Sequence, residues 1–225
     1  MAYSFISIDQ QDAVLVLTIQ RPDQLNALNK ATIEELNLAL NEADQNTSIR
    51  CVIITGSGTK AFVAGADIKE FAGFSVEQGE ALSRDGHNLL FNRVENMSKP
   101  VIAAVNGLCL GGGTEIVAAC DLAIASDRAE FGLPEPRVGL AALGGGALQR
   151  LAREMPMKDA MMLVLTGKRI NAREAQRISL INDVVPHAAL MDAARKLAGD
   201  ILACAPLAVQ ASKQVMLQSR DMALQ

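Results

Sequence analysis

Aromatic side chains are scarce in this chain of 225 residues, which contains six Phe, one Tyr and no Trp. Half of the residues are nevertheless hydrophobic and 20% are charged, and this balance excludes an intrinsically disordered chain. A chain of this length buries about 70% of its unfolded surface on folding, so it needs neither disulfides nor a metal ion for stability. The core must therefore be built from aliphatic residues and Met, packed closely around Ala and Gly.

Cysteine and histidine are also few, and their spacing argues against a metal site. The four cysteines form no CxxC pair, and neither histidine lies near one of them in the sequence. Each cysteine lies in an apolar stretch, which predicts buried, reduced thiols and a cytoplasmic location. We therefore expect no bound metal ion. The cysteines are Cys51, Cys109, Cys120 and Cys204.

The chain also lacks an excess of positive charge and any long apolar run. It has 21 Lys and Arg against 25 Asp and Glu, so the formal net charge of −4 argues against electrostatic binding of nucleic acid or anionic lipid. No apolar stretch approaches the roughly 18 residues of a membrane-spanning helix. Residues 1–10 lack the basic start and apolar run of a signal peptide. We expect a cytoplasmic protein that binds neither nucleic acid nor membrane.

Apolar strands alternate with helices over the first two-thirds of the chain. Strands are predicted at residues 5–8, 13–19, 50–56, 101–105 and 121–125, with a turn at 9–12. Helices are predicted at residues 30–44, 78–97, 111–120 and 144–153. After residue 156 the pattern is almost entirely helical, with stops at Gly167, Pro186 and Pro206. The sequence therefore predicts an α/β core over residues 1–156, followed by a helical region over 157–225.

Two glycine-containing loops have the composition of ligand sites. In residues 61–68, small side chains would let a ligand approach the backbone, and Asp67 would cap a following helix. The alternative is a tight loop with a capped helix and no ligand. In residues 106–115, the glycines at 111–113 open a helix whose bare N–H groups suit a phosphate or a developing oxyanion. These glycines match neither a dinucleotide fingerprint nor a nucleotide-triphosphate loop.

Two glutamates follow at Glu115 and Glu135. Glu115 lies in the first turn of an apolar helix, so burial would raise its pKa and suit it to proton transfer; the alternative is a surface residue that complements the helix dipole. Glu135 lies between two prolines that stiffen its backbone; the alternative is an exposed loop carboxylate paired with Arg137. The two glutamates flank one predicted strand, so the chain can bring both to the same end of the core. Two convergent carboxylates can hold one water molecule as base and acid.

These segments, in this order and spacing, resemble the crotonase superfamily, the enoyl-CoA hydratase/isomerase family, over essentially the whole chain. The resemblance implies an α/β fold, a crotonase-like spiral of ββα units, whose C-terminal helical region forms homotrimers or hexamers that are dimers of trimers. It also implies stabilisation of an acyl-CoA thioester enolate, with coenzyme A as part of the substrate and no separate cofactor. The matching segments are Arg21-Pro22, Asn26-Ala27-Leu28, Thr55-Gly56, Ala64-Gly65-Ala66-Asp67-Ile68, residues 99–107, Gly111-Gly112-Gly113 with Glu115, and residues 131–135, 165–167 and 184–186.

The family pattern also assigns the residues of the binding site. It places the oxyanion hole on the backbone N–H groups of Ala64 and Gly112, and it implies no metal ion. A wider set of residues is expected to line the path of the thioester and coenzyme A. This set consists of Leu25, Ala64, Gly65, Ala66, Asp67, Ile68, Gly111 and Gly112.

Glu115 and Glu135 occupy the positions of both glutamates of the hydratases. The resemblance therefore implies reversible syn addition of water to a 2-enoyl-CoA, giving a 3-hydroxyacyl-CoA. Glu135 would exchange a proton at the carbon next to the thioester, and Glu115 would activate or release the hydroxyl at the next carbon. The alternatives are an enoyl-CoA isomerase using Glu135 alone, other acyl-CoA enolate chemistry such as that of a carnitinyl-CoA dehydratase, and a non-catalytic relative that binds acyl-CoA or RNA. The acidic composition disfavours RNA.

Two features depart from the family pattern. Residues 140–146 lack the Pro-Gly pair of the fatty-acid hydratases, so the acyl group need not be a straight fatty chain. Leu133, Val138 and Leu143 predict an apolar acyl pocket. The helical pattern still runs at Gln225, where family members continue with further helices, and the resemblance therefore implies a sequence that is incomplete at its C-terminus.

Overall fold

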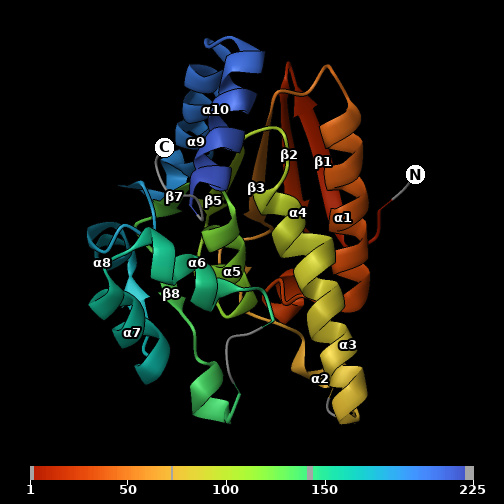
Figure 1. Ribbon diagram of the computed structural model, residues 1–225, viewed down its shortest axis with the longest axis vertical. Coiled ribbons are helices and arrows are strands. Elements are labelled where there is room, and N and C mark those ends of the chain that lie inside the picture. The colour runs from red at the N-terminus through yellow and green to blue at the C-terminus, as the bar shows by residue number, and fades with distance from the viewer. Residues whose placement is uncertain (1–2, 72, 141–143, 221–225) are drawn as a thin grey trace.

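The large sheet of the protein contains the strands that the apolar runs predict. The computed structural model describes residues 3–71, 73–140 and 144–220. In chain order the strands of this sheet are β1 (Ile6–Gln11), β2 (Val14–Ile19), β3 (Cys51–Gly56), β5 (Val101–Val105), β7 (Leu122–Ser126) and β10 (Asp183–Val185), and they are neighbours in the same order (Figure 1). Among the described strands of this large sheet, only the β1–β2 pair is antiparallel. β3 and β5 are buried along their whole length, which explains their nearly unbroken apolar sequences.

A second, smaller sheet follows the same path along the chain. Its strands are β4 (Ala61–Val63), β6 (Leu108–Leu110), β8 (Glu130–Gly132) and β9 (Ile170–Asn171), again neighbours in that order. The chain passes three times from the large sheet to the small one, from β3 to β4, from β5 to β6 and from β7 to β8, and each time a helical segment follows. This repeated path confirms the predicted α/β spiral of ββα units.

Helices cover both faces of the large sheet. Alternate residues of β2 point to opposite sides, so Leu15 and Leu17 join the core beneath α1 (Lys30–Gln45), whereas Val14 and Val16 pack towards α9 (Leu190–Leu202) (Figure 1). The other helices are α2 (Ile68–Phe71), α3 (Val76–Gly86), α4 (Asn92–Glu95), α5 (Gly112–Ala119), α6 (Ala147–Glu154), α7 (Met157–Thr166), α8 (Ala172–Arg177) and α10 (Pro206–Ser219). Helix α1 starts at a capped N-terminus, where the Asn29 side chain accepts a hydrogen bond from the Thr32 N–H.

The region after residue 156 contains two strands that the sequence pattern does not indicate. β9 pairs with β8 and β10 pairs with β7, so the expectation of an almost entirely helical segment is wrong at these places. Each strand has only two or three residues, and each depends on hydrogen bonds to a strand that is distant in sequence. The division of the chain at residue 156 remains a prediction.

Three other local expectations are also wrong. β1 continues to Gln11 because the solvent face of an edge strand tolerates polar residues, and this leaves Asp12 and Ala13 as the turn. The helix expected at residues 78–97 is interrupted between α3 and α4 by a π-helical turn (His87–Phe91). Cys204, which follows the end of α9, is exposed, whereas Cys51 and Cys109 are buried as expected.

Candidate active site

The predicted site segments surround one cavity of about 570 Å³. It lies between the loop after β4, the start of α5 and the 3-10 turn η3 (Glu135–Val138). The expected residues on its wall are Ala64, Gly65, Ala66, Ile68, Gly111, Gly112, Glu115 and Glu135. Leu25 and Asp67 are not among the wall residues. The Leu25 carbonyl accepts a hydrogen bond from the Ala64 N–H of the loop, and the Asp67 carboxylate pairs with Arg21 at 2.8 Å.

The glycines at the start of α5 are required by close contacts. Gly111 has φ +51°, a conformation that favours glycine, and a Cβ there would lie 2.7 Å from Oε1 of Glu135. A Cβ on Gly113 would lie 2.2 Å from the carbonyl oxygen of Val63 in β4. The Thr114 hydroxyl donates to the Gly132 carbonyl at 2.9 Å, which ties α5 to β8. These contacts fix the start of α5 against both neighbouring strands and place Glu115 on the cavity wall.

The structure corrects one of the two expected oxyanion donors. The Ala64 N–H donates to the Leu25 carbonyl at 3.1 Å, so it is not a free donor. The N–H groups of Ala66 and Gly112 have no acceptor among the residues that the structure describes. The two groups are adjacent, since a Cβ on Gly112 would lie 4.0 Å from the Ala66 nitrogen. Ala66 therefore replaces Ala64 as the partner of Gly112 in a candidate oxyanion hole.

Glu115 is held inside the protein at the inner wall of the cavity. The residue is only 5% exposed, and its Oε1 accepts a hydrogen bond from the Gly145 N–H at 2.7 Å. The pKa of Glu115 is raised from 4.5 to about 7. Burial is the main cause and the nearby charge of Glu135 adds to it, whereas the Gly145 and Ala147 N–H groups and the charge of Arg150 act in the opposite direction. A carboxyl group with a pKa near neutrality can accept or donate a proton under physiological conditions.

Glu135 is the first residue of η3 and lies beside the start of α5. Burial raises the pKa of Glu135 as well. Its Oε2 is buried and has no hydrogen-bond partner among the described residues, whereas its Oε1 lies beside Gly111. An unpartnered buried carboxyl oxygen favours the protonated form of the group. Glu135 therefore retains an oxygen that can exchange a proton with a molecule in the cavity.

The apolar part of the wall differs in part from the expectation. Val138 lines the cavity and is 64% exposed, as a residue facing an open pocket should be. Leu133 is fully buried in the hydrophobic core and does not line the cavity. Leu143 lies outside the described residues. The wall also contains apolar side chains that the sequence does not indicate as pocket residues, namely Leu28, Ile33, Phe74, Phe91 and Leu140.

The group that binds Glu115 has no recognisable signal in the sequence. Gly145 is recognisable in the sequence only as a glycine that opens a helix, yet its N–H is the hydrogen-bond donor to the Glu115 carboxylate. A Cβ at this position would lie 2.6 Å from Cδ of Glu115, so the backbone passes directly over the carboxyl group. No local sequence signal identifies such a contact between segments 30 residues apart.

No cluster among the described residues brings together three His, Cys, Asp or Glu side chains that could hold a metal ion. Within the same ranges, no helix is both long and apolar enough to cross a membrane.

The chain belongs to the enoyl-CoA hydratase/isomerase family, known as the crotonase family. The family model described as enoyl-CoA hydratase/isomerase matches residues 9–225. The two sheets, their spiral connection and the C-terminal helices form the crotonase fold. The family assignment covers both the segments that line the cavity and the helices that follow them.

Several named relatives are similar over nearly the whole chain. The short-chain-enoyl-CoA hydratase of Clostridium acetobutylicum is 43% identical over 96% of this chain and 82% of its own length. The 2,3-dehydroadipyl-CoA hydratase of Escherichia coli is 40% identical over 99% of this chain and 85% of its own length. The crystal structure of enoyl-CoA hydratase from Bacillus anthracis superimposes with a TM-score of 0.92 at 38% identity, covering 98% of this chain and 85% of that one.

Proposed function

We propose that the protein is an enoyl-CoA hydratase that adds water reversibly and in syn fashion to a 2-enoyl-CoA, giving a 3-hydroxyacyl-CoA. The observation that carries the proposal is the presence of two glutamates with raised pKa values on one cavity, beside two backbone N–H groups that have no acceptor within the described ranges. The names of the relatives support the reaction class, because both curated hydratases act on acyl-CoA thioesters.

The oxyanion hole binds the thioester carbonyl. Its oxygen accepts hydrogen bonds from the N–H groups of Ala66 and Gly112, and negative charge develops on this oxygen as the double bond is attacked. The Gly112 N–H lies at the start of α5, where the helix dipole also favours negative charge. Loss of one such donor in an enzyme raises the barrier by about 3 kcal/mol.

The two glutamates act on opposite ends of the double bond. The Glu115 carboxylate takes a proton from water while the water oxygen bonds to the carbon two positions from the thioester. The protonated Glu135 gives its proton to the carbon next to the thioester, and that carbon becomes a CH₂ group. The two carboxyl groups act as a coupled pair that shares one proton, and the reactive state has Glu115 ionised, with its carboxylate accepting the Gly145 N–H, and Glu135 protonated at its unpartnered Oε2. A proton then passes from Glu115 to Glu135, which resets the pair.

The loop after β4 forms the entrance for coenzyme A. Ile68 is 63% exposed at the mouth of the cavity and offers an apolar surface to the cofactor moiety of the substrate. Gly65 and Ala66 let the pantetheine chain approach the backbone, and Asp67 holds the loop through Arg21. Leu25 contributes through its carbonyl, which fixes the backbone of the loop.

An enoyl-CoA isomerase is the second candidate, and the unpartnered Oε2 of Glu135 favours it. A single carboxyl group with a free oxygen can remove a proton from one carbon and return it two carbons away. In that case Glu115 would be dispensable. Glu115 is, however, the more strongly held of the two groups, which favours hydration.

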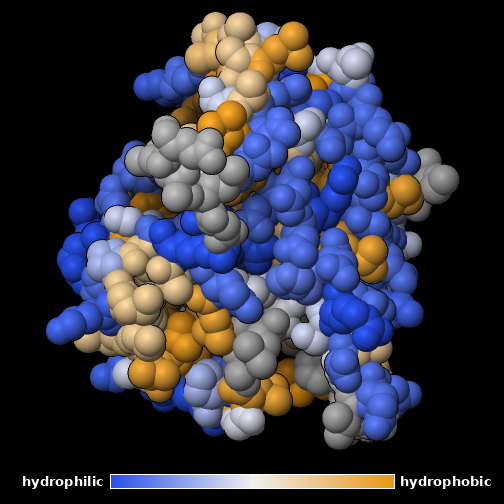
Figure 2. All heavy atoms as spheres, viewed as in Figure 1, coloured by the Kyte–Doolittle hydropathy of each residue, from blue (hydrophilic) through white to orange (hydrophobic). Residues whose placement is uncertain are grey.

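We also propose that the chain assembles as a homotrimer or a dimer of trimers through the apolar face of α7. Exposed apolar side chains gather over this helix in Figure 2, namely Met157, Met161, Met162 and Leu165. An exposed apolar patch of this kind marks an association surface. The mass of the protein in solution, measured by light scattering, tests this assembly. A monomer at micromolar concentration would contradict it.

The hydratase proposal is tested with crotonyl-CoA, whose conjugated thioester absorbance disappears on hydration. We expect turnover by the wild type and a loss of roughly 100-fold or more in each of Glu115→Gln and Glu135→Gln. Unchanged rates in both variants would contradict the assigned roles. A double-bond shift that survives Glu115→Gln, without hydration by the wild type, would favour the isomerase.

A further inference from the structure

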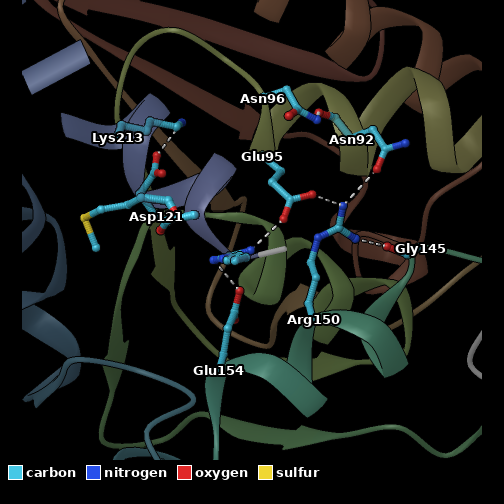
Figure 3. A network of polar contacts seen from close by, with 11 residues as sticks. Asn92, Glu95, Asn96, Asp121, Gly145, Arg150, Glu154 and Lys213 are labelled. Atoms are coloured by element: carbon cyan, nitrogen blue, oxygen red, sulfur yellow. Dashed lines mark hydrogen bonds and ion pairs between the residues drawn. The ribbon is translucent and has the colours of Figure 1, made fainter. Parts of the chain in front are cut away.

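Arg150 is a buried charged residue that lies behind the cavity without being part of its wall. It belongs to α6 and is 4% exposed. Its side chain points from α6 towards α4, where Nη2 donates to Oε2 of Glu95 at 2.6 Å and to Oδ1 of Asn92 at 3.0 Å (Figure 3). Its Nη1 donates to the carbonyl oxygen of Gly145. One guanidinium group thus joins α4 to the backbone segment that passes over Glu115.

Gly145 connects Arg150 to the candidate active site. On one side of its Cα, the Gly145 carbonyl accepts a hydrogen bond from Arg150, and on the other side its N–H donates to Oε1 of Glu115 at 2.7 Å. The backbone N–H of Arg150 also donates to the Gly146 carbonyl at 3.2 Å. Both peptide groups that flank Gly145 are therefore held, one by Arg150 and one by Glu115.

The ion pairs continue from Arg150 to the C-terminal helix. Glu95 shares its carboxylate between Arg150 and Arg220, which follows α10, and the Arg220–Glu95 distance is 2.9 Å. Arg220 also pairs with Glu154 at 2.9 Å. A buried arginine gains little net stability from its ion pairs, because desolvation offsets most of the attraction. Its forked geometry does, however, fix the groups to which it donates.

We propose that Arg150 is a positioning residue for the reaction, because it holds Gly145 so that the Gly145 N–H orients the Glu115 carboxylate towards the water in the cavity. Glu95 and Asn92 set the plane of the guanidinium group. This inference rests on the proposed hydratase function. It predicts that Arg150 affects the chemical step and not substrate binding, since Arg150 is absent from the cavity wall.

The steady-state test compares Arg150→Met with the matched variant Arg93→Met. Arg93 is a partly buried arginine on α4 that pairs with Asp44 at 3.2 Å and does not contact Gly145. In Arg150→Met we expect kcat for crotonyl-CoA to fall by about 10- to 100-fold, because a misplaced catalytic group reduces the rate by this order. KM should stay within about threefold in both variants, and kcat of Arg93→Met within about twofold of the wild type.

The pH profile supplies a readout that a purely structural role would not move. The charge of Arg150 and the hydrogen bond from Gly145 both lower the pKa of Glu115, so Arg150→Met should shift the acidic limb of kcat to higher pH. Arg150→Lys keeps the charge but cannot donate to Gly145, Asn92 and Glu95 in the same plane. We expect this variant to show the wild-type position of the acidic limb but only part of the wild-type kcat. Wild-type kcat in Arg150→Met, or full kcat in Arg150→Lys, would overturn the proposal.

A direct titration separates this inference from the hydratase proposal. The Glu115 carboxyl signal, assigned by its absence in Glu115→Gln, can be followed by carbon-13 NMR in the wild type, Arg150→Met and Arg150→Lys. A pKa that rises in Arg150→Met supports the link whether or not the protein hydrates crotonyl-CoA. An unchanged pKa in folded Arg150→Met would overturn it. If Arg150→Met does not fold, the Lys variant decides by its kcat. An inactive wild type overturns the hydratase assignment instead.

Discussion

Glu115 and Glu135 are chemically identical and line the same cavity, but the protein holds them differently. Glu115 lies in the first turn of α5, is almost completely buried, and accepts a hydrogen bond from Gly145. Glu135 begins a 3-10 turn between two prolines, is less buried, and has a carboxyl oxygen without a hydrogen-bond partner in the part of the chain that the structure describes. The orientation of water and the exchange of a proton with carbon can therefore be divided between two carboxyl groups. We infer that Glu115 is the oriented group for water and Glu135 the group that exchanges a proton with carbon.

The largest expected effect separates these two roles. In D₂O, a saturated acyl-CoA such as butyryl-CoA can exchange its C2 protons for deuterium without any addition of water. Glu135→Gln should slow this exchange by about 1000-fold, whereas Glu115→Gln should slow it by less than about tenfold. Mass spectrometry of the recovered thioester measures the exchange. An equal loss of exchange rate in both variants would mean that the two glutamates act as one unit and would contradict their separate roles.

The next prediction concerns stability and its dependence on pH. Because the pKa of Glu115 rises from 4.5 to about 7 on folding, its contribution to stability is complete below pH 4.5 and is lost as the pH rises through about 7. The shift corresponds to about 3 kcal/mol. Glu115→Gln should therefore match the wild type near pH 4.5 and exceed its free energy of unfolding by up to this amount at pH 8.

Urea unfolding at both pH values measures this difference, with Glu135→Gln as the comparison. Burial also raises the pKa of Glu135, so that variant should change in the same direction but by less, since its carboxyl group is less buried. If Glu135→Gln gained more in free energy of unfolding than Glu115→Gln, the result would contradict the weaker burial of Glu135 on which the two roles are based. An equal pH dependence in the wild type and Glu115→Gln would contradict the raised pKa.

Each of the two carboxyl groups lies against a glycine, and substitution of either glycine should have a smaller effect. A Cβ on Gly145 would lie 2.6 Å from Cδ of Glu115, and one on Gly111 would lie 2.7 Å from Oε1 of Glu135. Each alanine variant should lower hydration by about 10- to 100-fold by displacing one carboxyl group. Gly111→Ala should also slow C2 exchange, whereas Gly145→Ala should leave it nearly unchanged. Gly199→Ala is the control, because Gly199 lies on α9 and a Cβ there would meet no described atom within 4 Å.

The same contacts explain how far the sequence predicts this site. The glycines at 111–113 and the two glutamates stand out, because a bare helix start and convergent carboxylates have local sequence patterns. Ala64 and Ala66 have identical side chains on either side of Gly65, and only the tertiary contact from the Leu25 carbonyl shows which N–H is already used. Sequence alone cannot make that distinction.

The fold shows the same division between local and distant causes. β3 and β5 are predictable because burial on both faces requires apolar residues along the whole strand. β9 and β10 are not, because each is defined by pairing with a strand formed by a distant part of the chain. The burial of Arg150 is likewise not predictable from the sequence, since an arginine in a helix is ordinarily exposed.

The smallest expected effect comes from a contact that touches neither glutamate. Arg21 pairs with Asp67 at 2.8 Å and thereby holds the loop that carries Ala66. A partly exposed ion pair contributes up to about 1 kcal/mol, so Arg21→Met should raise KM for crotonyl-CoA by no more than about fivefold. kcat should stay within about twofold, because both carboxyl groups keep their positions. Initial rates over a range of substrate concentrations measure both constants, and Asp67→Asn should produce the same change without adding to it. A fall in kcat at constant KM would show instead that the loop positions the Ala66 N–H for the transition state, and the division of roles would then extend to the oxyanion hole.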